Sequence, residues 1–305
     1  MQSGRRLAPA KINLTLEVLT KRLDGFHTLR SVVVPLAFAD ELSWEASPRF
    51  RFACSEPSLE YDDNLVLRAA RALGLDQLPL KLTLKKEIPT GSGLGGGSSD
   101  AAALLLAAME GAFGPQPERD WLALARELGS DVPLFLLEAP ALIEATGERV
   151  TALGANPPWW VVLVCPTLPS PTEHAYRQLD ALPPRPSAPS RQASPSLALI
   201  EALQGHDFAT LNELLSNDFE RVFFPQPQMA PLLAAYARAG QRPHLSGSGS
   251  GLFTLHENES QAQAFATALT ADPAVRANAQ TPRCVPFLPS TRWHTVPQAR
   301  QAVQR

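Results

Sequence analysis

Apolar and polar residues alternate along residues 10–20, and this two-residue period predicts a β-strand with two different faces. One face carries four apolar side chains: Ile12, Leu14, Leu16 and Val18. The other face carries four polar side chains: Lys11, Asn13, Thr15 and Glu17. Lys11 and Asn13 therefore project together from the start of the strand. From the pattern alone, the favoured interpretation of this polar face is a strand surface exposed to water.

Similar patterns predict the remaining elements of the chain. Further strands are expected at 29–36, 41–44, 50–54, 80–84, 134–137, 141–145, 159–165, 252–255 and 284–288. Helices are expected at 65–73, 101–108, 120–128, 197–204, 208–219, 229–239 and 260–271. Asp24 and Gly25 are typical of a hairpin turn. Asn64 and Gly74 are typical of the two ends of a helix.

A glycine-rich loop, residues 89–99, separates the strand expected at 80–84 from the helix expected at 101–108. Five glycines fall within the seven residues from Gly91 to Gly97. Glycine lets the backbone approach a ligand closely, and successive bare N–H groups can then surround an anion. Ser98, Ser99 and Asp100 are typical N-cap and first-turn residues of the helix that follows. The loop therefore predicts a phosphate-binding site at a helix N-terminus.

Other glycine-rich loops do not fit this segment. A P-loop needs Lys and then Ser or Thr after its last glycine, whereas Ser98 follows Gly97. A dinucleotide-binding loop needs an acidic residue at the end of a second strand, but Glu118 lies in a proline-containing loop. The protein-kinase loop and its His-Arg-Asp motif are not matched either. A flexible linker is disfavoured because the loop lies between a strand and an apolar helix.

Composition limits the possible partners and the location of the protein. The 305 residues are enough for two domains, and the second is expected to begin near the strand at 159–165. A net charge of −3 gives no basic field for nucleic acid or an anionic membrane. Three widely spaced cysteines suggest neither a disulfide framework nor a metal site. No apolar run reaches membrane-spanning length, so we expect a cytoplasmic protein. Residues 298–305 are expected to form a loose tail.

Three further residues carry little weight from their local pattern. Asp131 lies between a predicted helix and the strand expected at 134–137, and an aspartate that stabilises a turn before Pro133 is the favoured interpretation. Phe26 and His27 lie at the predicted hairpin turn, where a single aromatic residue and a single histidine are usually incidental.

Three segments together resemble the signature motifs of the GHMP small-molecule kinase superfamily. They are residues 9–13, 89–102 and 245–253, in that order. Within the superfamily, the chain most resembles the kinases of 4-diphosphocytidyl-2-C-methyl-D-erythritol, by residues 22–29, 63–65 and 128–133 and by Pro171, Thr172, Tyr176, Asn217 and Asp218. The resemblance implies an α+β, two-domain GHMP kinase fold. A ribosomal-protein-S5-like ATP-binding domain would span 1–156, and a ferredoxin-like α/β sandwich would span 157–305. A mobile Pro/Ser-rich insert is expected at about 183–196.

The resemblance also implies an activity and roles for individual residues. The ATP γ-phosphate would pass to the 2-hydroxyl of the cytidylyl substrate, in the non-mevalonate route to isoprenoid precursors. Asp131 would be the general base, with Lys11 as its partner. The residues expected to contact ATP are Asn64 and Leu65 near the adenine and the loop Pro89, Thr90, Gly91, Ser92, Gly93, Leu94, Gly95, Gly96, Gly97, Ser98 and Ser99. The residues expected to contact the substrate are Asn13, Phe26, His27, Thr172 and Tyr176.

The resemblance leaves several points open. Mg²⁺ is expected with ATP, although no carboxylate pair in the sequence identifies its ligands. The family often has Tyr where this chain has Phe26, whose ring keeps a stacking face but has no hydroxyl. Another GHMP kinase, of the homoserine, galactose or mevalonate type, and a non-catalytic nucleotide sensor are the alternatives. Residues 24–27 favour the cytidylyl substrate, and the presence of both Lys11 and Asp131 favours catalysis. The oligomeric state is open.

Overall fold

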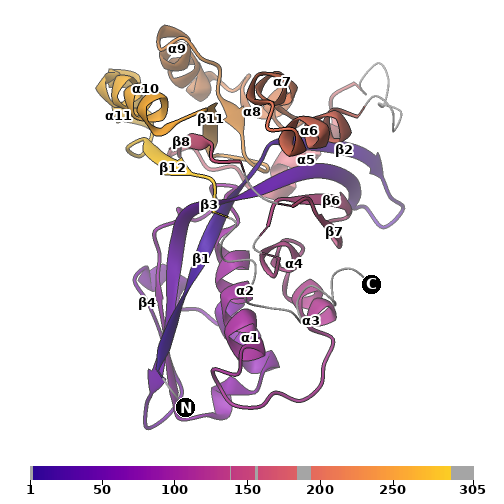
Figure 1. Cartoon of the computed structure of the whole chain (residues 1–305), viewed down its shortest axis with the longest axis vertical. Helices are drawn as coiled ribbons and strands as arrows, with labels where there is room; N and C mark the ends of the chain where they lie inside the picture. Colours follow the sequence, from indigo (N-terminus) through magenta and orange to yellow (C-terminus); the bar gives the residue numbers. More distant parts are fainter. Residues whose placement is uncertain (1–2, 138, 155–156, 184–193, 290–305) are drawn as a thin grey trace.

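Two β-sheets form the framework of the protein in the computed structural model, which describes residues 3–137, 139–154, 157–183 and 194–289 (Figure 1). In the larger sheet the order is β4-β5-β3-β2-β9, β1 and β6 also pair with β3, and β7 pairs with β6. Its strands are β1 (Gly4–Asn13), β2 (Thr15–Lys21), β3 (His27–Ala46), β4 (Arg51–Cys54), β5 (Leu80–Lys85), β6 (Ala141–Ala145), β7 (Arg149–Ala152) and β9 (Ser216–Asn217). The smaller sheet has the order β10-β11-β8-β12. Its strands are β8 (Trp160–Val164), β10 (His244–Leu245), β11 (Leu252–His256) and β12 (Arg283–Pro286).

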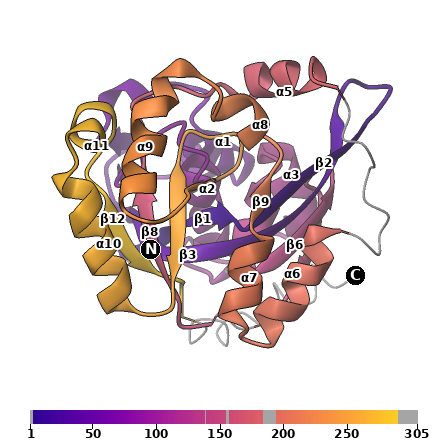
Figure 2. The ribbon, with the colours of Figure 1, turned by 90° about the horizontal axis from the view of Figure 1, so that it is seen from above.

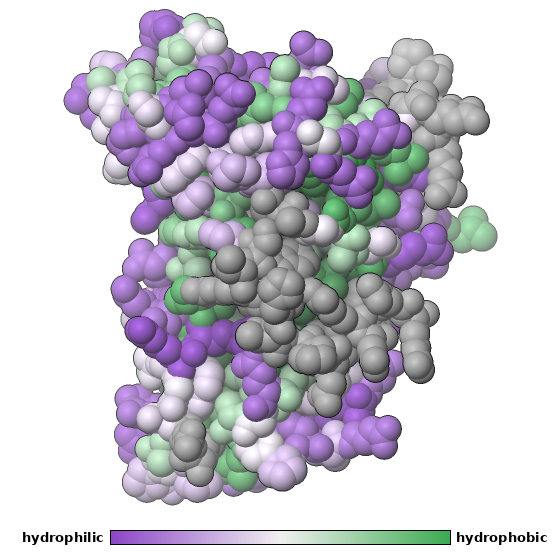
Figure 3. All heavy atoms as spheres, in the orientation of Figure 1, coloured by the Kyte–Doolittle hydropathy of each residue, from purple (hydrophilic) through white to green (hydrophobic). Residues whose placement is uncertain are grey.

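Helices cover both sheets. Beside the larger sheet lie α1 (Leu65–Ala72), α2 (Gly96–Met109), α3 (Trp121–Leu128) and α4 (Val132–Phe135). In the other half are α5 (Thr172–Asp180), α6 (Pro195–Gln204), α7 (Phe208–Leu214), α8 (Glu220–Phe223), α9 (Ala230–Arg238), α10 (Glu259–Ala271) and α11 (Pro273–Asn278). Seen from above, α9, α10 and α11 surround the smaller sheet, whereas α6 and α7 lie beside β9 (Figure 2). Hydrophilic side chains gather over α10 and α11 on the face shown in Figure 3, as expected for helices with an outer surface in water.

The long strand β3 organises the larger sheet. It pairs with β1, β2, β5 and β6, and in Figure 1 it runs from the lower part of the molecule to the upper right. The sequence predicted two separate strands at 29–36 and 41–44, and this is wrong. The residues between them are also extended, because Ala39 and Asp40 both pair with β1. The expected hairpin is present, since Arg22 N–H donates to Phe26 O at 2.7 Å.

The hydrophobic core is continuous across the middle of the chain. In α2, the residues from Ala101 to Ala108 are all buried, as their apolar composition predicts. A second cluster joins Ile12 and Leu36 of the larger sheet to Leu163 and Phe253 of the smaller one. β9, from the second half of the chain, also pairs with β2 in parallel. The division of the chain at residue 156 therefore stays a prediction.

Three other predictions of local structure are wrong. Residues 134–137 were expected to be a strand, but Val132–Phe135 form the helix α4. The helix expected at 208–219 is divided into α7, β9 and α8, because Ser216 and Asn217 pair with β2. Residues 194–196 were expected to belong to a mobile insert, but Ser194 is the N-cap of α6 and Ser196 is fully buried within it. The rest of the predicted insert, 184–193, and the tail at 298–305 lie outside the described residues.

Among the helices in the described part of the chain, none has the length and apolar character needed to cross a membrane.

Candidate active site

Two glycine loops contact each other at the centre of the site: the first is residues 89–99 and the second is residues 245–251. Gly251 N–H donates to Ser92 O at 2.8 Å, and Ser246 Oγ donates to Gly93 O at 3.0 Å. A Cβ atom on Gly93 would lie 2.1 Å from Ser246 O, and one on Gly251 would lie 2.5 Å from Ser92 O. Side chains at these positions would force the loops apart. The sequence identified both loops, but it could not predict that they touch, because they are separated by about 150 residues.

The first glycine loop turns directly into α2. Gly95 has φ +75° and precedes the helix, which begins at Gly96. Ser98 and Ser99 were expected to be N-cap or first-turn residues, and both lie in the first turn of α2. The N-cap is Gly95, so the part of the prediction that makes Ser98, Ser99 or Asp100 the cap is wrong. A Cβ atom on Gly95 would lie 2.7 Å from the Phe135 ring and 3.1 Å from Lys11 Cγ. The free N–H groups at the start of α2 are thereby held next to Lys11.

Lys11 is fixed by its own strand. Its backbone N–H donates to Leu94 O at 2.9 Å, which ties β1 to the glycine loop. Its Nζ donates to Asn13 Oδ1 at 2.6 Å, and Asn13 Nδ2 donates to Ser31 Oγ at 2.8 Å. Gly247 N–H, from the second glycine loop, also donates to Asn13 Oδ1 at 2.8 Å. Asn13 thus joins the strand, the ammonium and the second loop.

The polar face of the first strand is buried, contrary to the interpretation from its pattern. Lys11 and Asn13 are 4% and 5% exposed, and Thr15 and Glu17 are also buried. Thr15 Oγ1 bonds to Ser196 Oγ at 2.7 Å, and Glu17 accepts from Ser194 Oγ at 2.7 Å, so the start of α6 covers this face. Burial lowers the pKa of Lys11, and the negative charge of Asp131 partly opposes that shift.

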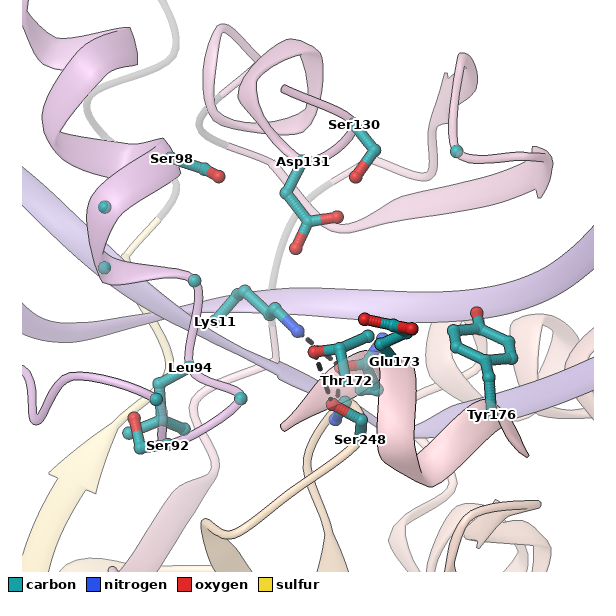
Figure 4. Close-up of a pocket in the computed structure, with 18 of the residues that line it drawn as sticks. Lys11, Ser92, Leu94, Ser98, Ser130, Asp131, Thr172, Glu173, Tyr176 and Ser248 are labelled. Carbon is teal, nitrogen blue, oxygen red and sulfur yellow. Dashed lines mark hydrogen bonds between the residues drawn. The ribbon is translucent and has the colours of Figure 1, made fainter. Parts of the chain in front are cut away.

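Asp131 lies immediately before α4 and faces Lys11 across the cavity (Figure 4). Its carboxylate makes no side-chain hydrogen bond to any residue that the structure describes. Burial raises the pKa of Tyr176 to about 12, with a further contribution from the charge of Asp131. The charge of Asp131 therefore acts both on the catalytic candidate Lys11 and on the substrate candidate Tyr176.

A cavity of about 830 Å³ collects the predicted site residues. All of them line it except Ser99. Ser99 is 1% exposed and faces the core, because it is one step of about 100° around α2 from Ser98, which does line the cavity. The cavity also includes Ser130 and Ser248, from the motif segments 128–133 and 245–253, and three residues that the sequence did not single out: Lys86, Glu173 and Asp180. No local pattern distinguished these three residues from ordinary polar surface.

One end of the cavity is formed by the first turn of α1. The Asn64 side chain caps this helix, since its Oδ1 accepts from Val66 N–H at 2.9 Å. Its Nδ2 donates to Leu59 O at 2.9 Å, so both the oxygen and the nitrogen of the side-chain amide form hydrogen bonds. Leu65 is the first residue of α1. Asn64 therefore holds the helix start in place at the cavity wall.

Another part of the cavity wall contains an aromatic stack. The rings of His27 and Tyr176 lie 4.9 Å apart and nearly parallel, at 16°. Tyr176 also packs edge-on against Phe219 at 4.8 Å. Phe26 lines the cavity but is 67% exposed, so its ring belongs to the rim. Thr172 Oγ1 bonds to Ser248 Oγ at 3.0 Å, linking α5 to the second glycine loop.

A buried ion cluster lies behind the first glycine loop. Lys86 Nζ contacts both Asp40 Oδ2 and Asp100 Oδ2, and all three side chains are at most 3% exposed. Burial opposes the charge on Lys86, but the two carboxylates outweigh this effect and raise its pKa. Burial, together with the nearby Asp40 carboxylate, raises the pKa of Asp100 to about 8 despite Lys86. The cluster therefore places one buried ammonium between two buried carboxyl groups.

Comparison with known proteins decides the family. Residues 64–139 match the family described as GHMP kinases N terminal domain. The 4-diphosphocytidyl-2-C-methyl-D-erythritol kinase of Citrifermentans bemidjiense is 36% identical over 274 residues, which cover 86% of this chain and 93% of the relative. The enzyme of the same name from Deinococcus radiodurans is 41% identical over 271 residues, covering 86% and 87% of the two chains. The chain belongs to this kinase family.

Solved structures agree with this family assignment. A crystal structure of 4-(cytidine 5'-diphospho)-2C-methyl-D-erythritol kinase is 34% identical, has a TM-score of 0.74, and is matched over 93% of this chain and 99% of that one. The homoserine kinase of Cytophaga hutchinsonii is 20% identical, with a TM-score of 0.66 over 93% and 98% of the two chains, and it shows the common fold alone. The α+β GHMP kinase fold expected from the sequence is thereby confirmed. GHMP kinases take their phosphate from ATP.

Proposed function

We propose that this protein transfers the γ-phosphoryl group of ATP to the 2-hydroxyl of 4-diphosphocytidyl-2-C-methyl-D-erythritol. One observation carries the proposal: Asp131 and Lys11 face each other in a single cavity, between a glycine loop at a helix start and the His27–Tyr176 stack. The glycine loop suits the phosphates of ATP, and the aromatic stack suits the cytidylyl group. Lys11 and Asp131, which lie between them, suit the transfer of the phosphoryl group.

ATP binds with its phosphates on the first glycine loop. The N–H groups at the start of α2 have no partners within the helix and carry a partial positive charge, which stabilises phosphate oxygens. The second glycine loop supports the first one from behind through Ser246 and Gly251. The adenine lies toward Asn64 and Leu65 at the start of α1, at one end of the same cavity. This places the γ-phosphate toward Lys11.

Asp131 then acts as the general base. It takes the proton of the substrate hydroxyl as the hydroxyl oxygen attacks the γ-phosphorus, and the bond from phosphorus to the ADP oxygen breaks. Lys11 stabilises the charge that develops on the phosphoryl oxygens. Phosphoryl transfer depends mainly on positioning and charge stabilisation, which this pair supplies at the meeting point of the two substrates.

Mg²⁺ is compatible with the residues present. The described residues contain no group of three or more His, Cys, Asp or Glu that could hold a metal ion. Mg²⁺ does not need one, because it keeps several waters and binds through one or two protein oxygens together with the substrate phosphates. The Ser98 hydroxyl, which lines the cavity at the start of α2, is the protein oxygen that we assign to it. When bound, Mg²⁺ offsets charge on the phosphate oxygens.

The cytidylyl group occupies the end of the cavity formed by His27, Tyr176, Thr172 and the rim residue Phe26. Aromatic rings and a histidine at this end supply stacking and hydrogen bonds for a pyrimidine.

With a net charge of −3 the protein has no basic field for nucleic acid, so a small molecule is its partner. We place the protein in the cytoplasm, where ATP is available, and retain the domain division 1–156 and 157–305.

The test is an ATP-consumption assay with a panel of acceptors. The cytidylyl substrate should be phosphorylated efficiently, whereas homoserine and mevalonate should not. Removing the cytidylyl group, to give 2-C-methyl-D-erythritol 4-phosphate, should abolish turnover because the stacking and hydrogen-bonding contacts are lost. Efficient turnover of the bare phosphate would refute the assignment of His27 and Tyr176. Turnover of another acceptor alone would refute the proposed substrate.

A further inference from the structure

Asp180, the last residue of α5, contacts two residues of the hairpin at the substrate end of the cavity. Its Oδ1 lies 2.7 Å from His27 Nε2, and its Oδ2 accepts from Lys21 Nζ at 2.6 Å. Lys21 ends β2 and His27 begins β3, so one carboxylate spans the base of the hairpin. All three side chains line the cavity. No sequence pattern pointed to a role for Asp180.

The His27 ring is constrained on two sides. Tyr176 covers one face, at 4.9 Å, and the side chain as a whole is only 8% exposed. Tyr176 and Asp180 are four residues apart, on adjacent turns of α5, so one helix supplies both constraints. The helix therefore determines both the plane of the ring and its rotation about its own axis.

The contact with Asp180 also decides the position of a proton. An ionised carboxylate only accepts hydrogen bonds, so the ring nitrogen facing it must carry the hydrogen. The hydrogen bonds from Lys21 and His27 lower the pKa of Asp180, which keeps this carboxylate ionised. In neutral His27, a hydrogen on Nε2 leaves Nδ1 as an acceptor.

We propose that Asp180 is a positioning residue for pyrimidine recognition: it acts through His27 by fixing the ring orientation and by holding the ring proton on Nε2. The inference rests on the proposed function, because it assumes that His27 meets the base. In this assignment Asp180 acts on the base through His27 and not on the reacting hydroxyl. Its effect should therefore fall on substrate binding and not on the phosphoryl-transfer step.

The first experiment compares Asp180→Asn with the wild type in steady-state assays. The KM for the cytidylyl substrate should rise about tenfold, the loss expected for one hydrogen bond to a charged group, with kcat and the KM for ATP nearly unchanged. Asp272→Asn is the matched control, because it makes the same change at a distant carboxylate that pairs with Arg238 and caps α11. This control should behave as the wild type. An unchanged KM in Asp180→Asn would overturn the inference.

The second experiment separates an effect through His27 from simple tethering of the hairpin by Lys21. Asp180→Asn and His27→Gln, alone and combined, should give strongly non-additive changes in KM, since both remove the same contact. Lys21→Gln should be additive with His27→Gln. Additive effects of Asp180→Asn and His27→Gln would overturn the inference. They would mean that the Asp180 carboxylate acts by anchoring the hairpin through Lys21.

The third measurement does not depend on activity. Nitrogen-15 NMR of the histidine rings, with His27 assigned through His27→Gln, should show the Nε2–H form in the wild type. In Asp180→Asn the two forms should interconvert, because an amide can either donate or accept. The Nδ1–H form in the wild type would overturn the inference. Failure of the wild type to phosphorylate the cytidylyl substrate would instead refute the proposed function and leave this spectroscopic result standing.

Discussion

Lys11 donates from Nζ to Asn13 Oδ1 at 2.6 Å, so the ammonium is aimed by the residue two places along its own strand. The same oxygen accepts Gly247 N–H at 2.8 Å. A single amide therefore orients the candidate catalytic cation and joins the second glycine loop to it. Two hydrogens of the ammonium remain for a phosphoryl oxygen and for the carboxylate of Asp131.

Replacing Asn13 by leucine tests this arrangement. Asn13→Leu keeps the approximate volume but removes the acceptor, which leaves the buried Lys11 ammonium without its hydrogen bond and misplaces it. We expect kcat to fall about 10²-fold, because misplacement near the reacting atoms is costly. The comparison is Ser31→Ala, which removes the bond from Asn13 Nδ2 at 2.8 Å and the bond from Ser31 Oγ to Thr15 O. It leaves the bond from Lys11 Nζ to Asn13 Oδ1 in place and should reduce kcat much less. Equal losses in the two variants would mean that Asn13 is needed only for packing.

Replacing the candidate base should separate binding from chemistry. Asp131→Asn should cut turnover by at least ~10² and leave affinity for a non-hydrolysable ATP analogue nearly intact, because the amide cannot take the hydroxyl proton. Turnover is measured by steady-state kinetics and affinity by calorimetry. Asp120→Asn is the control, since Asp120 caps α3 and asparagine caps a helix equally well. Near-normal turnover in Asp131→Asn would rule out its role as the base.

The contact between the two glycine loops predicts a difference between two glycines of the same loop. Gly91 and Gly93 have φ values of +70° and +73°, so alanine is strained at both, by about 1–2 kcal/mol. Only Gly93 has a close neighbour, because its Cβ would lie 2.1 Å from Ser246 O, whereas nothing lies within 4 Å at Gly91. Gly93→Ala should therefore weaken ATP binding, measured by calorimetry, much more than Gly91→Ala. Similar affinities in the two variants would show that loop contact does not shape the phosphate site.

Local patterns in the sequence predicted an element correctly where the hydrophobic period and the capping residues of that segment alone determine its structure. The strand at 80–84 and the helix capped by Asn64 are examples, since both follow from period and capping. The patterns failed where distant segments decided the outcome. Residues 216 and 217 are extended because β2 offers them unpaired hydrogen-bonding groups, and no local signal contains that information.

In the candidate site, too, local patterns predicted some residues and missed others. The glycine loop predicted an anion site from backbone chemistry alone. Lys11 and Asn13, by contrast, have the pattern of an exposed strand face, and only the covering α6 and the second glycine loop bury them. Their role, and that of Asp131, followed from the family resemblance. Lys86 and Asp180 had neither a pattern nor a motif, because their importance arises from partners more than 40 and 150 residues away.

The buried ion cluster predicts unequal effects of two adjacent lysines on stability. Lys86→Met leaves the Asp40 carboxylate buried without its ammonium, so the free energy of unfolding should fall by about 3–5 kcal/mol. Lys85→Met removes only an exposed pair with Glu87, 3.1 Å apart, and should change it by less than about 0.5 kcal/mol. Urea unfolding of both variants measures the difference. Equal stabilities would mean that water or a rearranged side chain replaces Lys86.

A buried histidine in the smaller sheet predicts how stability depends on pH. Burial lowers the pKa of His256 to about 4, and its Nε2 bonds to Thr254 Oγ1 at 3.0 Å. The folded protein keeps this ring neutral, whereas the unfolded chain binds a proton as the pH falls through about 6.5. The stability that depends on His256 is therefore complete above about pH 6.5 and is lost progressively toward pH 4.

The variant His256→Gln, which has no proton to gain, should reduce this loss. Between pH 7 and pH 5 its free energy of unfolding should fall by up to about 2 kcal/mol less than that of the wild type, at about 1.4 kcal/mol per pH unit below 6.5. The control is His206→Asn, at an exposed position whose φ of +55° asparagine tolerates. It should follow the wild type across this range. If His256→Gln lost as much stability as His206→Asn, the ring of His256 would have to be protonated in the folded protein.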